Sequence, residues 1–156
     1  MDDVNIRLAL PNDAAELARL RFALRSRAEG DVESEADFLD RCAAWITHAL
    51  QQPNWLCWLA ERDGMLVGTL WLQLIEKIPN PASESEYFAY ITSFFISESI
   101  RGKGLGSRML SKAISWCREN DVHTALLWPT DRSRSLYHRY GFATPDEILA
   151  LVIQSE

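Results

Sequence analysis

The chain lacks the cysteines, the positive charge and the long apolar runs that define several classes of protein. Its three cysteines, Cys42, Cys57 and Cys117, are odd in number and show no metal-ligand spacing, so a disulfide scaffold and a zinc site are not expected. We interpret them as small buried apolar residues whose thiols stay reduced. A formal net charge of -6 argues against a nucleic-acid partner, which needs a surplus of Lys and Arg.

No apolar run approaches the roughly 18 residues that a membrane span requires. The first residues, Met1-Asp2-Asp3, are acidic, unlike the positively charged start of a secretory leader. We therefore expect a cytoplasmic protein without a membrane partner. Repeats and low-complexity linkers are also missing, so residues 1–156 are expected to form a single domain, with 47% apolar residues to supply its core.

Apolar periodicity and turn residues predict one mixed sheet flanked by helices. Strands are expected over residues 5–10, 55–62, 65–75, 87–96, 124–128 and 148–153. Helices are expected after the start signals Asp13–Glu16 and Ser34–Asp37, and over residues 107–119 and 133–140. Asp63-Gly64 between the second and third strands is a strong signal for a two-residue hairpin. The element order is β-α-α-β-β-β-α-β-α-β, which indicates an α/β (α+β) fold.

A glycine-rich segment, Arg-Gly-Lys-Gly-Leu-Gly at 101–106, lies between a strand and an amphipathic helix. Its backbone N–H groups are not crowded by side chains, and the helix dipole adds positive potential, so the segment can hold phosphates. Arg101 and Lys103 add charge there, and Arg101 could bind phosphate oxygens in a bidentate fork. The P-loop pattern fails because Ser107 follows Gly106, and position 107 also fails the dinucleotide pattern. A pyrophosphate-bearing cofactor is therefore predicted.

Two motifs resemble those of a known family, the GCN5-related N-acetyltransferases (GNAT). Arg-x-x-Gly-x-Gly at 101–106 resembles its acetyl-CoA signature, and Leu-Tyr-His-Arg-Tyr-Gly-Phe at 136–142 resembles its Leu-Tyr-x-x-x-Gly-Phe motif. The element order also resembles this fold from Asn5 to Ile153. The resemblance implies a mixed, mostly antiparallel sheet, acetyl-CoA as co-substrate without a metal, and transfer of an acetyl group to a primary amine of a small molecule or a protein.

The resemblance also implies roles for particular residues. The pantetheine arm of the coenzyme would enter between strands 87–96 and 124–128, and Tyr137 would act as the general acid that protonates the departing sulfur. The residues implied to bind the cofactor are Phe95, Ile96, Arg101, Gly102, Lys103, Gly104, Leu105, Gly106, Ser107, Thr130 and Ser133. Many relatives carry Asn where this chain has Thr130, and Ser133 is open to a second interpretation as a helix cap.

Several questions stay open at this stage. Glu84 and Glu86 are candidates for the general base, but a simple role at a strand start explains them as well, and no base is identified. Acidic residues near the expected acceptor pocket would suit a cationic amine if they line it, although ordinary solvated loops are the favoured interpretation: Glu29, Asp31, Glu33, Glu35, Glu84 and Glu86. A non-catalytic acyl-CoA sensor, a transferase of a longer acyl group and a homodimer are the alternatives that remain.

Overall fold

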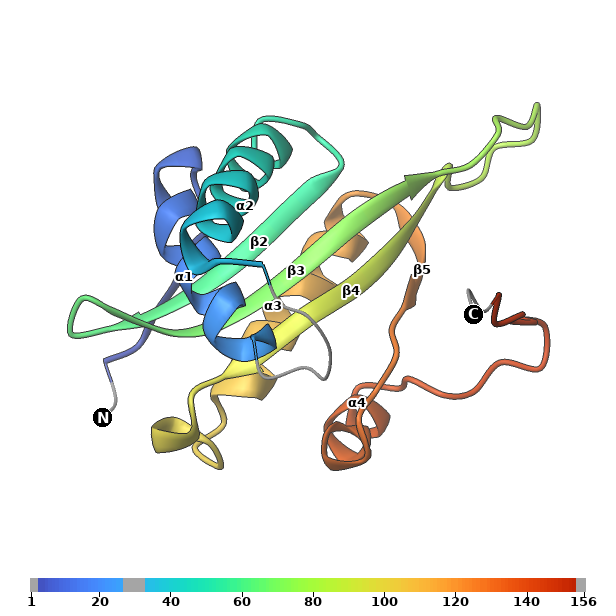
Figure 1. Ribbon diagram of the computed structural model, residues 1–156. Helices are drawn as coiled ribbons and strands as arrows, with labels where there is room; N and C mark the ends of the chain where they lie inside the picture. The colour runs from blue at the N-terminus through green and yellow to red at the C-terminus, as the bar shows by residue number, and fades with distance from the viewer. Residues whose placement is uncertain (1–2, 27–32, 154–156) are drawn as a thin grey trace.

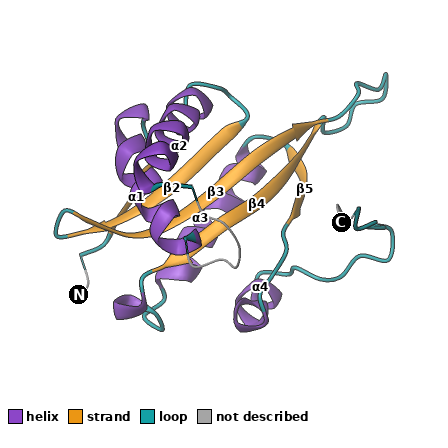
Figure 2. Ribbon diagram, viewed as in Figure 1, coloured by secondary structure: helices purple, strands orange, loops and turns teal. Residues whose placement is uncertain are grey.

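A computed structural model describes residues 3–26 and 33–153, and its centre is a five-stranded sheet (Figures 1 and 2). In sheet order the strands are β1 Asn5–Leu8, β2 Trp55–Arg62, β3 Met65–Glu76, β4 Tyr87–Ile96 and β5 Val122–Leu126. Neighbouring strands are antiparallel except β4 and β5, which are parallel. The expected mixed, mostly antiparallel sheet flanked by helices is confirmed.

Helices cover both faces of this sheet (Figure 1). They are α1 Ala14–Arg25, α2 Glu35–Ala49, α3 Leu105–Glu119 and the short α4 Arg134–Arg139. Because side chains alternate along a strand, Cys57 and Leu59 of β2 pack with α1 and α2, whereas Trp58 and Ala60 pack in the core cluster that contains α3. Within residues 3–26 and 33–153, no helix combines the length and the apolar character needed to cross a membrane.

The turn between β2 and β3 forms as its two residues predict. Asp63 and Gly64 both have left-handed backbone conformations, with φ of 52° and 74°. Two consecutive positive φ values are typical of the tight hairpin turn whose twist matches that of the strands, and Asp-Gly tolerates them well. The hairpin prediction is confirmed.

The two predicted helix start signals have different outcomes. The Ser34 hydroxyl accepts a hydrogen bond from the Asp37 backbone N–H at 3.2 Å, so the prediction for α2 is confirmed. The expected capping box of Asp13 and Glu16 is wrong, because the Asp13 side chain forms no cap hydrogen bond to α1. Its carboxylate turns back toward the chain that precedes the helix.

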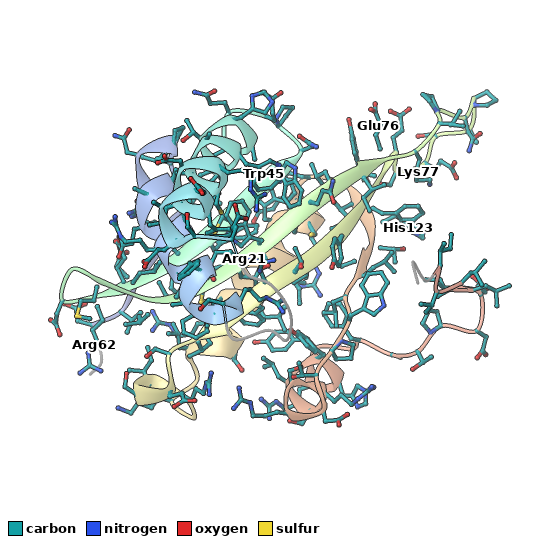
Figure 3. All side chains as sticks on the ribbon, viewed as in Figure 1. Arg21, Trp45, Arg62, Glu76, Lys77 and His123 are labelled. Atoms are coloured by element: carbon teal, nitrogen blue, oxygen red, sulfur yellow. The ribbon has the colours of Figure 1, made fainter. Side chains whose placement is uncertain are left out.

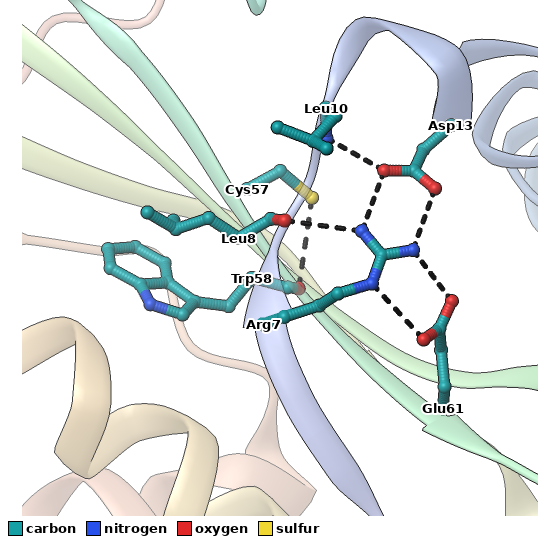
Figure 4. A network of polar contacts seen from close by, with 7 residues as sticks. All are labelled: Arg7, Leu8, Leu10, Asp13, Cys57, Trp58 and Glu61. Atoms are coloured by element: carbon teal, nitrogen blue, oxygen red, sulfur yellow. Dashed lines mark hydrogen bonds and ion pairs between the residues drawn. The ribbon is translucent and has the colours of Figure 1, made fainter.

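Asp13 instead belongs to an ionic cluster that ties β1 to α1 and β2 (Figure 4). The Arg7 guanidinium donates two hydrogen bonds of 2.9 Å to Asp13 and also binds Glu61 at 2.8 Å. The Leu10 backbone N–H donates to Asp13 at 2.7 Å. These donors stabilise the charged form, so the pKa of the Asp13 carboxyl lies below its usual value. The contact with Arg7 therefore replaces the capping role that the local sequence pattern predicts for Asp13.

The strand expected over residues 148–153 does not form, and this prediction is wrong. The segment has no regular secondary structure, and Leu149 and Ile153 are 95% and 86% exposed. An apolar stretch becomes a strand only by pairing its backbone groups with a neighbour. After α4 the chain runs away from β5 (Figure 1), so β5 stays at the edge of the sheet.

The cysteines lie as expected for apolar residues. All three are free, and Cys57 and Cys117 are buried, whereas Cys42 is partly exposed. Burial raises the pKa of the Cys117 thiol to about 11 and that of Cys57 well above its usual value. These two thiols are therefore protonated near neutral pH and poor nucleophiles.

Candidate active site

The site begins where β4 and β5 part. Their pairing runs from Tyr87 opposite Val122 to Tyr90 opposite Leu126 and stops there. Residues 91–96 of β4 then pair only with β3, so one edge of this strand has free backbone groups to offer a ligand. Strand β5 ends two residues earlier than predicted because Leu127 and Trp128 line the opening instead of continuing the ladder.

An irregularity in β4 helps to open this edge. The register with β3 shifts between Thr69 and Trp71, and Ser93 on the facing strand has a left-handed φ of 49°. The Thr69 hydroxyl donates a hydrogen bond to the Ser93 carbonyl at 3.3 Å. A bulge of this kind bends a strand and re-aims its side chains, and non-glycine residues in this conformation recur at functional sites.

A groove of about 980 Å³ follows the opened edge and continues to the start of α3. Its lining contains every residue predicted to contact the coenzyme except Lys103, which is exposed and does not line it. The predicted residues that line the groove are Phe95, Ile96, Arg101, Gly102, Gly104, Leu105, Gly106, Ser107, Thr130, Ser133 and Tyr137. Segments that are distant in the sequence therefore meet at one surface.

The glycine-rich segment presents the start of a long helix to this groove. Gly102 and Gly104 have φ of 76° and 82°, and α3 begins at Leu105 without a side chain that caps it. The amides of a first helical turn have no acceptor within the helix, and the helix dipole makes this end positive. Such a helix start can bind a phosphate or pyrophosphate.

The charge of the groove is opposite to that of the whole chain. Five arginines line it: Arg21, Arg25, Arg101, Arg132 and Arg139. Among the described residues, no Asp, Glu or His side chain lines it. Although the formal net charge is -6, the groove therefore attracts anions.

Arg101 has a structural role in addition to its charge. Its Nε donates a hydrogen bond of 2.8 Å to the Ile96 carbonyl, and its Nη1 pairs with Glu98 at 3.3 Å. These contacts hold the glycine-rich segment against the end of β4. The expected bidentate contact of Arg101 with a phosphate stays a prediction.

Tyr137 is buried at the side of the groove, with 7% of its surface exposed. Its ring centroid lies 6.4 Å from that of Phe94 on β4 and 5.6 Å from that of Phe142. Burial raises the pKa of the Tyr137 phenol, an effect that the Ser133 hydroxyl partly offsets. The phenol therefore keeps its proton at neutral pH and can act as a donor.

Two further contacts position α4. The Tyr140 hydroxyl donates a hydrogen bond of 2.8 Å to the Ser107 carbonyl in the first turn of α3. Gly141 ends the helix with a φ of 89°, as its place in the motif predicts. The motif at 136–142 and the glycine-rich segment are thus linked directly.

Thr130 and Ser133 form a reciprocal cap before α4. The Thr130 backbone N–H donates to the Ser133 hydroxyl at 2.9 Å, and that hydroxyl lies 2.9 Å from the Thr130 hydroxyl. Ser133 precedes α4 as its N-cap residue, but its hydroxyl forms no cap hydrogen bond to that helix and instead closes the 3-10 turn Asp131–Ser133, so the interpretation of Ser133 as the cap of the helix is wrong. Both side chains also line the groove, so a contact with the coenzyme stays a prediction.

The acidic residues considered for the acceptor side do not line the groove. Glu84 belongs to the loop between β3 and β4, which extends beyond the tip of the sheet (Figure 1), and it contacts Asn80 and Lys77. Glu33 pairs with Arg41 on α2. Glu35 and Glu86 are also absent from the lining, and Glu29 and Asp31 lie outside the described residues. The solvated-loop interpretation fits the described members of this set.

Four residues on the acceptor side were missed by the sequence analysis: Arg21, Trp71, Thr92 and Ser93. Arg21 lies on α1 and donates to the Ser93 hydroxyl across 72 positions of sequence. No local pattern marks Arg21, whereas Thr92-Ser93 is a polar interruption in an aromatic strand and could have been noticed. Their proximity depends on how α1 crosses the sheet.

Comparison with known proteins gives one family and one fold. The sequence model of the acetyltransferase (GNAT) family matches residues 17–142. A mycothiol acetyltransferase from Acidimicrobium ferrooxidans is 34% identical over 97 residues, which cover 60% of this chain and 30% of that protein. The chain thus spans less than a third of that relative's length.

Solved structures with the same fold cover nearly the whole chain. A predicted acetyltransferase with acetyl-CoA from Clostridium acetobutylicum superposes with a TM-score of 0.76 at 23% identity, over 96% of each chain. A GCN5-related N-acetyltransferase from Ralstonia eutropha gives a TM-score of 0.74 at 23% identity, over 96% of this chain and 98% of that one.

Proposed function

The chain belongs to the acetyltransferase (GNAT) family, and we propose that it is an acetyl-CoA-dependent enzyme that acetylates a primary amine by direct attack on the thioester. The observation that carries this proposal is the groove itself. One end is an uncapped helix start rich in glycine, the buried phenol of Tyr137 lies at its side, and a free strand edge runs along it.

In this proposal the coenzyme lies along the groove. Amides of residues 102–107 bind its pyrophosphate, and the groove arginines outside α1, which are Arg101, Arg132 and Arg139, neutralise its charge. The free edge of β4 at Phe95 and Ile96 binds the amides of the pantetheine arm as an added strand would. This arrangement directs the thioester toward the Ser93 bulge and Tyr137, because the arm follows β4 away from the pyrophosphate.

Tyr137 is proposed as the general acid. When the amine attacks the thioester carbonyl, the carbon–sulfur bond of the tetrahedral intermediate breaks, and the leaving thiolate has a conjugate acid with a pKa of about 8.5. The raised pKa of Tyr137 keeps the phenol protonated, so that it can donate its proton to the sulfur. The product thiol then leaves along the groove.

The amine must lose a proton before it attacks, and an alkylamine with a pKa of about 10.4 is mostly charged at pH 7. No carboxylate or imidazole lines the groove among the described residues, so we propose that this proton passes to water in the open groove. The concentration of neutral amine then controls the rate below the amine pKa.

Release of free thiol from acetyl-CoA tests the proposal. Purified protein should release thiol only when a suitable amine is present, and mass spectrometry should find the acetylated amine in equal amount. Propionyl-CoA and succinyl-CoA in parallel separate acetyl transfer from transfer of a longer acyl group. Tight binding of acetyl-CoA without turnover on any amine would contradict the proposed reaction.

A further inference from the structure

A second hollow of about 470 Å³ opens beside the groove, between the helices α1 and α2 and the sheet. The two cavities adjoin each other, since they share residues from α1, β3 and β4, including Arg21, Trp71 and Ser93. This second hollow therefore reaches the place where the thioester would lie. We call it the acceptor hollow.

One wall of the acceptor hollow is aromatic. The rings of Trp45, Trp55 and Trp71 lie 5.2 to 6.2 Å apart, in edge-on and tilted pairs. Trp45 on α2 is 49% exposed, although its neighbours are more buried. A cluster of large rings that leaves one ring half open offers an apolar surface, which is typical of a ligand site.

The lining of the hollow also carries a cation that no described carboxylate neutralises. Arg21 is half-buried, and its guanidinium donates to the Ser93 hydroxyl at 2.9 Å. No Asp or Glu among the described residues pairs with it, although a guanidinium has five N–H donors. Burial and the nearby Arg25 lower its pKa, as expected for a charge that is partly removed from water beside another cation.

Arg41, the second arginine in the lining of the hollow, differs from Arg21 because a carboxylate neutralises its charge. Arg41 also lines the hollow, but Glu33 neutralises it, and its guanidinium lies over the Phe38 ring at 5.5 Å. Figure 3 shows Arg21 over the middle of the sheet, below Trp45 and far from the charged tip that carries Glu76 and Lys77. An anion that enters the hollow would therefore meet Arg21.

We infer that the acceptor is an amine with a carboxylate a few bonds away and an aromatic body, as in an aromatic amino acid. The inference rests on the proposed function. The carboxylate binds Arg21, the body packs on the Trp45 cluster, and the amine faces the thioester beside Ser93. Arg21 touches the Ser93 side chain, so the anion and the reacting amine must be close to each other in the acceptor.

A polycationic acceptor fits this hollow poorly. Aromatic faces can bind cations, but here the charged side chains of the lining are two arginines, and no carboxylate among the described residues joins them. A second positive charge on the acceptor would be repelled by Arg21 without compensation. The acidic net charge of the chain is therefore a poor guide to this site.

Matched pairs of compounds test the inference. Each pair differs only in the carboxylate: phenylalanine and phenethylamine, tryptophan and tryptamine, tyrosine and tyramine, with spermidine as a polycation. Calorimetry on the protein loaded with coenzyme A measures binding, and thiol release measures turnover. The carboxylate-bearing member of at least one pair should bind about 10- to 100-fold more tightly, as expected for a charge-assisted contact. Equal binding within all three pairs, or a preference for spermidine, would overturn the inference.

Substitutions test which residues cause the preference for a carboxylate-bearing acceptor. Arg21→Gln should remove the preference for the carboxylate without changing affinity for the decarboxylated partner. Arg19→Gln is the matched control, because Arg19 is an exposed arginine on the same helix that lines neither cavity. Trp45→Ala should weaken both members of a pair equally. If Arg21→Gln instead lowers affinity for coenzyme A, then Arg21 belongs to the coenzyme site and the inference is wrong.

The outcome also separates this inference from the proposed function. If amines without a carboxylate are acetylated as well as those with one, and Arg21→Gln has no effect, the acetyl transfer stands and the carboxylate site fails. If neither acetyl-CoA nor coenzyme A binds, the proposed function itself fails. Both results are read from the same calorimetric and thiol-release measurements.

Discussion

Substitution of Gly104 by aspartate tests the proposed phosphate site at its most exposed point. Gly104 precedes the first turn of α3 with a φ of 82°, and a Cβ placed on it would meet no atom within 4 Å. The variant should therefore fold without a clash. The variant should lose about 1 kcal/mol of the free energy of unfolding, because a residue with a side chain is strained in the left-handed backbone conformation.

The loss of coenzyme affinity should be larger. A new carboxylate about 5 Å from a phosphate, at an effective dielectric constant of about 20, is repelled by about 3 kcal/mol for each pair of unit charges. Gly104→Asp should therefore weaken binding of coenzyme A by more than about 100-fold. Calorimetric titration with coenzyme A gives the affinity, and thermal unfolding of the free protein gives the change in stability.

Gly64→Asp is the matched control for this prediction. Gly64 has a similar φ of 74°, a Cβ added to it would likewise meet no atom within 4 Å, and it lies in the β2–β3 hairpin outside the groove. The two variants should lose similar stability, but only Gly104→Asp should lose coenzyme affinity. Unchanged affinity in Gly104→Asp, or the same loss in both variants, would refute the assignment of residues 102–107 to the pyrophosphate.

The remaining predictions concern the proposed acid and the ionic cluster. Tyr137→Phe should lower kcat by about 100- to 1,000-fold and leave the dissociation constant of coenzyme A unchanged, whereas a parallel loss of binding would mark Tyr137 as structural. In the unmodified enzyme kcat/KM should rise from pH 7 to about 9, because the neutral fraction of the amine grows with pH. The Tyr137 phenol stays protonated over this range, since its pKa is raised. A fall of kcat/KM in this range would indicate an essential acid of lower pKa. Asp13→Asn should lower the free energy of unfolding by about 1 kcal/mol at pH 7, and Asp63→Asn, at an exposed carboxylate, should not. Since Arg7 lowers the pKa of Asp13, this contribution should be complete above about pH 5 and should decline as the pH falls below about 4, so a difference that does not shrink between pH 5 and pH 2 would contradict it.

The acceptor side illustrates how charge can mislead when it is read from composition. The net charge of -6 and the acidic loops suggest a cationic amine, but the lining of both cavities carries arginines and, among the described residues, no carboxylate. Charges on a solvated loop contribute little to a cavity that other elements enclose. A compound screen should therefore include amines with a carboxylate as well as polyamines.

The sequence by itself determined the features that depend on near neighbours in the chain. Runs of aromatic and aliphatic residues identified β2 and β4 to the residue, Asp63-Gly64 identified the hairpin, and the motifs at 101–106 and 136–142 identified the family and part of the groove lining. These signals are local, because backbone conformation and the periodicity of burial act over a few residues.

Only the tertiary structure decided the features that need a distant partner. Asp13 meets Arg7 and Glu61 instead of capping its helix, and residues 148–153 find no strand to pair with. Arg21 reaches Ser93 because the fold brings this part of α1 next to β4, and its charge makes the acceptor hollow basic. Pairing and charge compensation depend on which segments the fold brings together, so the pattern along the chain could not reveal them.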